Sequence, residues 1–190
     1  LITAAAMGVG VALCMASIAF QDGMYAQMFD VMVTDSLGHV QIHHPDYPGR
    51  KRLHDALDDS DALRAAIEGV DGARLSTPRL FAFALAGGDD TSAGAQLVGV
   101  LPDDENEVTG IARKLVDGAW LGADAGQQIV LGVDLADELK LSVGDELVLV
   151  GQDAYGGMAN DLYTVRGIAR TGQTALDRGG AWMHLSDLQT

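Results

Sequence analysis

The chain opens with an uncharged apolar stretch from Leu1 to Phe20, and all 12 Lys and Arg and all 27 Asp and Glu come after it. Sixteen of these 20 residues are apolar. At about 1.5 Å rise per residue, an α-helix of this length spans about 30 Å, which matches the hydrocarbon core of a bilayer. The pattern therefore predicts a membrane-spanning helix.

Two other interpretations of this stretch stay open. A secretory signal peptide has an apolar part of about 7 to 15 residues after a basic start, whereas this stretch is longer and has no basic start. The core helix of a soluble protein is disfavoured by the scarcity of polar residues. The membrane span is the favoured interpretation.

Apolar positions recur at helical spacing beyond Phe20, including three methionines four residues apart. We predict one long helix that leaves the membrane near Phe20 and continues as an amphipathic stalk to about Ser36, where Gly38 supplies the stop. The methionines are interpreted as packing positions against a neighbouring helix rather than as a ligand site. The span and the stalk together cover residues 1–36.

Charge changes the picture in two ways. No Lys or Arg occurs before Arg50, and because cytoplasmic flanks are rich in these residues, the remainder is predicted to lie outside the cytoplasm. A net charge of −15 argues against nucleic-acid binding, since phosphate contacts need clustered Lys and Arg.

The single cysteine, Cys14, has no partner for an intrachain disulfide. Because the chain begins with Leu1, we also expect it to be part of a longer protein.

Beyond the stalk, strand-like and helical patterns alternate, which predicts an α+β fold. The segments 145–151 and 162–170 are expected to form a hairpin, with Gly167 at a bulge or a close backbone approach. The predicted strands are 39–44, 73–86 (with Phe81, Phe83 and Leu85 on one side), 95–101, 127–132, 145–151, 162–170 and 181–185. The predicted helices are 62–69, 111–120 and 133–141, of which the first is capped by Asp58, Asp59, Ser60 and Asp61 and the second is closed by Gly118. A solvated helix entry is predicted after Pro102, with Asp103, Asp104, Glu105 and Glu107. A further helix is predicted to start at Ser186 and Asp187.

Candidate chemistry is sparse. His39 and His43 would share a face of the first predicted strand, but His54 and His184 are distant in sequence and no cysteine or well-placed carboxylate completes a metal site. A polar outer strand face is the favoured interpretation. The chain lacks the phosphate-loop, nucleophile-elbow and HExxH motifs. We predict no catalytic, cofactor-binding or metal-binding residues and a protein that is not an enzyme.

The order of five segments resembles a known family. The long apolar helix is followed by GHVQIHHPDY, AQLVGVLPDDE, IVLGVDLADELKLSVGDELVLV and YTVRGIAR. This order resembles the extracytoplasmic domain of MacB/FtsX-type ABC transporter permeases, and it is most similar to the lipoprotein-releasing (LolC/LolE-like) permeases. The best-matched stretch runs from Ile129 to Val150.

The resemblance implies a permease with four membrane helices whose outer domain lies between the first and the second. Residues 37–101 would begin a porter-like α/β part, and residues 102–190 would form a sabre-like, mostly β part and the start of the return. The implied partners are a cytoplasmic ATP-binding cassette subunit, a second permease subunit, membrane lipid, and a periplasmic carrier or lipoprotein. The implied location is the cytoplasmic (inner) membrane, with most of the chain periplasmic.

The resemblance further implies a mechanical role, in which the stalk transmits ATP-driven movement to the outer domain. An alternative from a different class is the extracytoplasmic sensor domain of a membrane receptor, which also follows an N-terminal span and also needs no catalytic residues.

Overall fold

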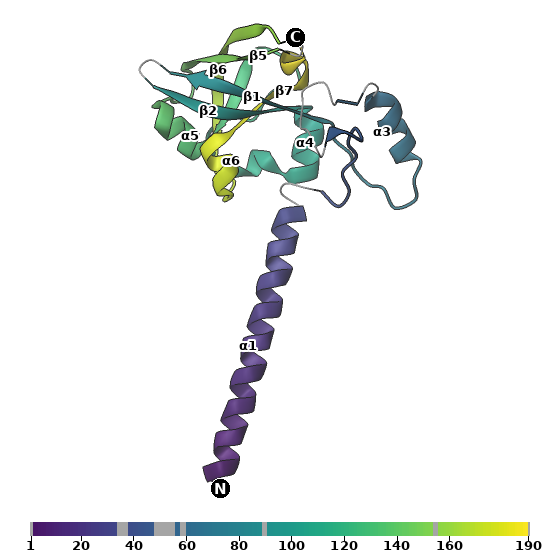
Figure 1. Cartoon of the computed structure of the whole chain (residues 1–190), viewed down its shortest axis with the longest axis vertical. Helices are drawn as coiled ribbons and strands as arrows, with labels where there is room; N and C mark the ends of the chain where they lie inside the picture. Colours follow the sequence, from purple (N-terminus) through teal and green to yellow (C-terminus); the bar gives the residue numbers. More distant parts are fainter. Residues whose placement is uncertain are drawn as a thin grey trace. The chain divides into compact units, whose positions relative to one another are not determined.

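The computed structural model describes residues 2–33, 38–47, 56–57, 60–88, 91–153 and 156–189. The chain divides into two compact units, residues 1–41 and residues 42–190. The first unit is built around a single long helix, and the second contains all the strands (Figure 1).

Helix α1 (Ile2–Met32) is 31 residues long and uninterrupted, which confirms that the apolar span continues directly into the following segment. At about 1.5 Å per residue it is about 46 Å long, well beyond the roughly 30 Å of a hydrocarbon core. Its Ile2–Phe29 part is long and apolar enough to cross a membrane. Gly38 has a φ of 68° and donates its N–H to the Val33 carbonyl at 2.9 Å, as expected of a glycine that ends a helix. The predicted end at Ser36 lies outside the described residues.

The second unit is a mixed sheet with short helices. Its strands are β1 (Arg79–Gly87), β2 (Ser92–Val100), β3 (Leu115–Gly118), β4 (Gln128–Gly132), β5 (Glu146–Gln152), β6 (Met158–Ala169) and β7 (Gly180–His184). Its helices are α3 (Ser60–Glu68), α4 (Pro102–Thr109), the 3₁₀ helix η2 (Ile111–Lys114), α5 (Val133–Leu139), α6 (Thr174–Gly179) and α7 (Leu185–Leu188). The α+β class expected from the sequence is therefore observed.

The sheet closes on itself. Its strand order is β3-β6-β4-β7-β2-β1-β5, and β5 also pairs with β6. The long strand β6 makes this possible, because residues 158–164 pair with β5 while residues 164–169 pair with β4. Six strands thus form a barrel, and β3 adds to β6 alongside it. Closure leaves few unpaired backbone groups at sheet edges.

The barrel interior is the main core of the second unit. Every strand of the ring contributes residues that alternate inward along it, as the pleat of a strand requires. Helix α5 follows the end of β4 and α7 follows the end of β7, and since β4 and β7 are antiparallel these helices lie at opposite ends of the barrel. Leu135, Leu139 and Leu188 bring both helices into the core cluster. Figure 1 shows α5 beside α6 next to the strands.

Strand β1 places its small residues inside. Ala82 and Ala86 are buried in the barrel, whereas Phe83 and Leu85 on the other side are 70% and 50% exposed. The expected grouping of the aromatic and Leu residues on one side is confirmed, and that side is the outer surface of the barrel. Large side chains from other strands, among them Tyr163 and Met183, share the interior with these alanines.

A second apolar cluster covers another part of the outer barrel surface. Val98, Val130 and Trp182 point outward and pack against Ile111, Leu121 and the helix α6 residue Leu176. The strand β6 contains the expected irregularity there, since Val165 and Gly167 are successive partners of β4 and Arg166 is the extra residue. A Cβ on Gly167 would lie 2.6 Å from the Ala119 carbonyl oxygen. Gly167 therefore marks both a bulge and a close backbone approach, as predicted.

Several sequence predictions are wrong. Residues 39–44 are irregular rather than a strand and belong to none of the sheet pairings described. Residues 111–120 do not form one helix: η2 ends at Lys114 and β3 follows, since this segment pairs with β6. Gly118, with a φ of 73°, ends a strand rather than a helix. Residues 73–78 precede β1 as irregular chain.

Helix ends also differ in detail. Ser60 is the first residue of α3, and Asp58 and Asp59 lie outside the described residues. The N-terminal cap of α7 is His184, whose ring accepts a hydrogen bond from the Ser186 N–H, rather than Ser186 or Asp187.

The expected division between residues 101 and 102 falls between β2 and α4, and strands from both sides of it share the barrel.

Candidate functional site

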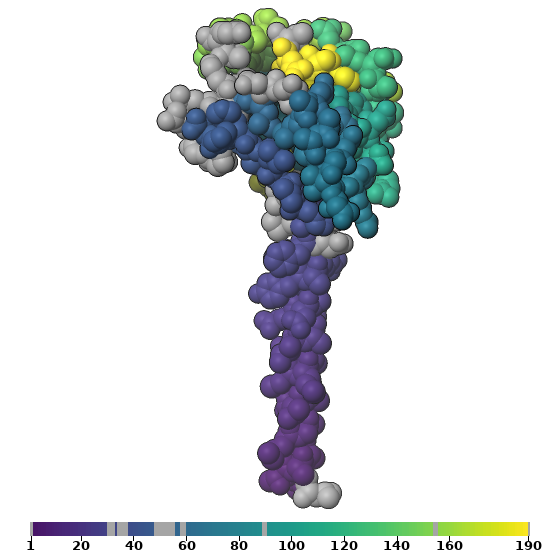
Figure 2. Space-filling model, turned by 90° about the vertical axis from the view of Figure 1, so that its right-hand side faces the viewer, coloured from purple at the N-terminus to yellow at the C-terminus, as the bar shows by residue number. Residues whose placement is uncertain are grey.

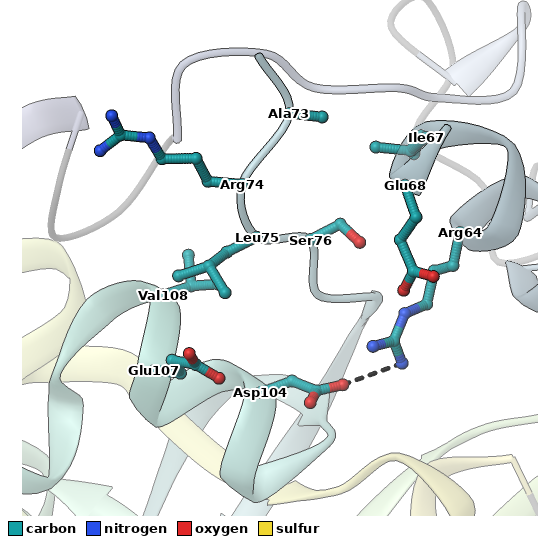
Figure 3. A pocket seen from close by; sticks show the side chains of 10 residues that line it. All are labelled: Arg64, Ile67, Glu68, Ala73, Arg74, Leu75, Ser76, Asp104, Glu107 and Val108. Carbon is teal, nitrogen blue, oxygen red and sulfur yellow. Dashed lines mark ion pairs between the residues drawn. The ribbon is translucent and has the colours of Figure 1, made fainter. Parts of the chain in front are cut away.

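A hollow of about 200 Å³ lies between α3, the segment 73–76 and α4. Figure 2 shows α3 and the segment after it, in blue, at the surface beside the teal and green of later elements. The hollow is lined by Arg64, Ile67, Glu68, Ala73, Arg74, Leu75, Ser76, Asp104, Glu107 and Val108 (Figure 3). Two cationic and three anionic side chains thus meet a smaller number of apolar ones.

One ion pair bridges the hollow. The Arg64 guanidinium contacts the Asp104 carboxylate at 2.8 Å, with side chains 28% and 31% exposed. In Figure 3, Arg64 and Asp104 point toward one another, whereas the Arg74 side chain points away from this pair. A partly exposed pair of this kind adds at most about 1 kcal/mol to stability. It links α3 to α4.

Helix α4 is held to the barrel by a buried ion pair. Arg79 at the start of β1 donates from Nε to Glu105 Oε2 at 2.8 Å and from Nη2 to Oε1 at 2.7 Å. The Thr109 hydroxyl donates to the Glu105 carbonyl oxygen at 2.8 Å. Glu105 is 2% exposed. The sequence interpretation of residues 103–107 as a solvated helix entry is therefore wrong for Glu105, because Arg79 offers a two-pronged partner that only the fold brings near.

This arrangement can hold elements together. The charged groups of the hollow are Arg, Asp and Glu, and its hydroxyl, Ser76, comes with no histidine among the lining residues. Among the described residues, no three His, Cys, Asp or Glu side chains lie close enough to hold a metal ion.

The histidines considered from the sequence have different contacts. His43 stacks on Tyr47 with ring centroids 5.2 Å apart. His184 is occupied at both ring nitrogens, with Nδ1 2.9 Å from Ser186 Oγ and Nε2 3.0 Å from the Ala123 carbonyl oxygen. His39 is exposed in the irregular segment, and His54 lies outside the described residues.

A polar cluster lies where β6, α7 and the loop before β4 meet. Gln127 donates from its side chain to Asp161 at 2.9 and 3.0 Å and from its N–H to Asp187 at 3.2 Å. Burial, followed by the nearby charges of Asp161 and Asp187, raises the pKa of Tyr163 to about 12. The tyrosine therefore stays protonated and can donate to the Asp187 carbonyl oxygen, 3.4 Å away.

Sequence reasoning missed the residues that fasten the elements together. Arg79 and Glu105 are 26 positions apart, and no local pattern pairs them. Arg166 donates to the Trp120 carbonyl at 2.6 Å and to Gln128 at 2.7 Å. The predicted irregularity at Gly167 was the one signal near this residue, because a bulge redirects the adjacent side chain.

Relatives of the chain occur among transporter proteins. Two curated relatives are the lipoprotein-releasing system transmembrane proteins LolC of Xylella fastidiosa strains 9a5c and Temecula1. Each is 29% identical over 101 residues, which cover 50% of this chain and 24% of the relative. The matched part thus spans about a quarter of the length of these relatives.

A solved structure shares the fold. The extracellular domain of the ABC-type transporter YknZ from Gram-positive bacteria superposes with a TM-score of 0.52 at 15% sequence identity, covering 68% of this chain and 64% of that one. The family described as the MacB-like periplasmic core domain matches residues 1–190. These findings confirm the predicted resemblance to MacB/FtsX-type permeases, and the chain belongs to the MacB-like periplasmic core domain family.

Proposed function

We propose that the chain forms the first membrane helix and the extracytoplasmic domain of an ABC transporter permease. In this role it transmits ATP-driven movement from a separate cytoplasmic ATPase to the release or export of a substrate such as a lipoprotein. The observation that carries the proposal is the uninterrupted helix α1, because a stiff element that is longer than the membrane is thick can pass a movement across the boundary.

Three further observations support this role. The LolC relatives are named for lipoprotein release, which suggests the substrate class. The charge-free start and the acidic remainder suit an inner-membrane protein whose larger part lies in the periplasm. The chain contains no phosphate-loop motif, so ATP hydrolysis would belong to a partner subunit. A second permease subunit, and a periplasmic carrier for the released substrate, complete the proposed assembly.

We also keep the division of the outer domain as a proposal. Residues 37–101 would correspond to the start of a porter-like part and residues 102–190 to a sabre-like part with the start of the return. Because β1 and β2 share the barrel with β4 to β7, these two parts would be joined by a common sheet rather than by a flexible linker.

The test is to purify the protein from its native membrane under mild detergent and identify what accompanies it. We expect a nucleotide-binding subunit in fixed ratio, and ATP hydrolysis that depends on both subunits. A full-length protein with two spans and a cytoplasmic signalling module, and without an ATPase, would instead make it a receptor.

A further inference from the structure

The outer surface of β1, β5 and β6 carries an unusual concentration of exposed apolar side chains. We call this set the apolar face: Phe83, Leu85, Val148, Val150, Met158 and Leu162, which are between 36% and 85% exposed. Together they expose a few hundred Å², near the upper end for a contiguous patch on a soluble domain. An apolar patch of this size commonly marks a site of interaction.

The strand register makes the apolar face continuous. Leu85 lies opposite Val150, and Val148 lies opposite Leu162. Each set of residues opposite one another on the three strands forms a row. Met158 lies opposite Gln152, in the row next to that of Val150. Side chains directly opposite one another on one face of neighbouring strands are in contact range. The six residues therefore form one surface across three strands.

The apolar face contains no charge and has an acidic edge. The other outward positions among these rows are Gly87, Gln152 and Asn160. The nearest charged residues are Glu146, on the outward side of β5, and Asp153, in the hairpin after β5, whereas Asp161 alternates to the other side of β6 and pairs with Gln127. In a chain with a net charge of −15, a neutral centre with a negative edge favours a partner with an apolar centre and a positive edge.

A hollow of about 340 Å³ adjoins the apolar face at Phe83. It is lined by Phe83, Ala84, Gly94, Ala95, Gln96, Ala175 and Gly179. A Cβ on Gly94 would meet nothing within 4 Å, so this part of the hollow is open. The basic residue next to it, Arg178, lies 3.9 Å from the Asp134 carboxylate. The hollow offers room for one apolar anchor of a partner, as interface hot spots require.

We propose that the apolar face binds an amphipathic helix of a partner protein, with aliphatic residues against the barrel, one of them in the hollow at Gly94, and Lys or Arg along its edges. Size favours a single helix, because a standard protein interface needs about 800 Å² from each side. Charge disfavours a second copy of this chain, since two acidic edges would face each other. This binding surface is independent of the proposed transport function.

The probe is a synthetic 18-residue helix with Leu on one face and Lys on the other. Its affinity is measured on the full chain in nanodiscs of zwitterionic lipid, with empty nanodiscs subtracted. We expect saturable binding with one peptide per chain, weakened at least about tenfold in the Phe83→Thr/Leu162→Thr variant, in keeping with the loss of two central anchors. We expect a similar loss in Gly94→Leu, which fills the hollow without displacing backbone.

Matched controls separate this surface from general attraction to an acidic protein. The Val70→Thr/Leu75→Thr variant changes two side chains that are 59% and 53% exposed on other segments and should bind normally. Glu146→Lys should weaken binding several-fold, whereas Glu107→Lys on α4 makes the same charge change elsewhere and should not.

Three results would overturn the proposal. The first is that a peptide with Leu on one face and Glu on the other binds as tightly as the Leu/Lys peptide. The second is that the control variants lose as much affinity as Phe83→Thr/Leu162→Thr. The third is self-association of the chain that disappears in Phe83→Thr/Leu162→Thr, which would identify a second copy as the occupant.

Discussion

At the scale of single residues, the ion pair between Arg79 and Glu105 fastens helix α4 to the barrel. It joins the first strand of the barrel to the helix after the second strand, through two hydrogen bonds of 2.8 and 2.7 Å. The side chains are 20% and 3% exposed. Removing the Glu105 carboxylate is costly, because the largely buried Arg79 guanidinium loses the acceptor of both hydrogen bonds.

We predict that Glu105→Gln lowers the free energy of unfolding by about 3 kcal/mol. Urea denaturation followed by the fluorescence of Trp120 and Trp182 measures it, since both tryptophans belong to the second unit. Glu107→Gln, an exposed change on the same helix, should shift stability by at most about 0.5 kcal/mol. The double variant Arg79→Met/Glu105→Leu should recover much of the loss, because no unpaired charge remains. Equal effects at positions 105 and 107 would contradict this role.

The second prediction at this scale concerns Tyr163. Its pKa is raised to about 12 in the folded state, by burial first and then by Asp161 and Asp187, whereas the unfolded chain has the ordinary value near 10. Between these values the unfolded tyrosine has lost its proton and the folded one has not, so the folded state binds more protons and stability falls as pH rises. The contribution is complete below about pH 10 and is lost by about pH 12.

Tyr163→Phe should therefore flatten the decline of stability between pH 10 and pH 12. The measurement is the urea midpoint of the wild-type chain and of the variant at several pH values in this window. Parallel curves would show that another group causes the decline.

At the scale of elements, the helix α1 and the run from β4 to β6 were predicted closely, and both depend on local patterns. Helix α1 follows from an unbroken apolar and helical periodicity. The strand, helix, turn and hairpin of residues 128–169 follow from changes in period and from Gly144 at the turn, where φ is 96°. The segment 111–120 failed because Leu115–Gly118 pairs with β6, more than 40 residues later, and this pairing overrides its helical spacing.

The element-scale prediction tests the stiffness of α1. Two glycines inserted between Asp30 and Val31 should uncouple ATP hydrolysis from transport while the outer domain stays folded, because each glycine costs about 1 kcal/mol of helix stability relative to alanine. Two alanines inserted at the same point shift the helix register equally but keep it stiff, and they should retain more transport. The measurements are ATPase rate and substrate release by the complete transporter in vesicles.

Two glycines placed between Asp124 and Ala125, in an exposed loop of the second unit, provide a further control. This variant should transport normally. If the two-glycine and two-alanine insertions in α1 reduced transport equally, register rather than stiffness would be the cause, and the mechanical account would fail.

At the scale of the whole molecule, the second unit contains its own core. Both apolar clusters draw their residues from positions 81–188, and the barrel is closed by pairing among its own strands. We predict that residues 42–190 fold without α1 into a soluble domain that unfolds in a single cooperative step. Circular dichroism and urea denaturation of this fragment test it. An aggregated or molten fragment would show that the core needs α1.

Local patterns in the sequence predicted the long apolar helix α1, the resemblance to the family, the β4 to β6 run and the bulge at Gly167. The tertiary structure alone decided the closure of the barrel, the burial of Glu105, and the outward position of Phe83 and Leu85. Alternation along a strand shows which residues share a side, but not which side faces the core. That choice depends on strands distant in sequence, which here enclose Ala82 and Ala86 in the core.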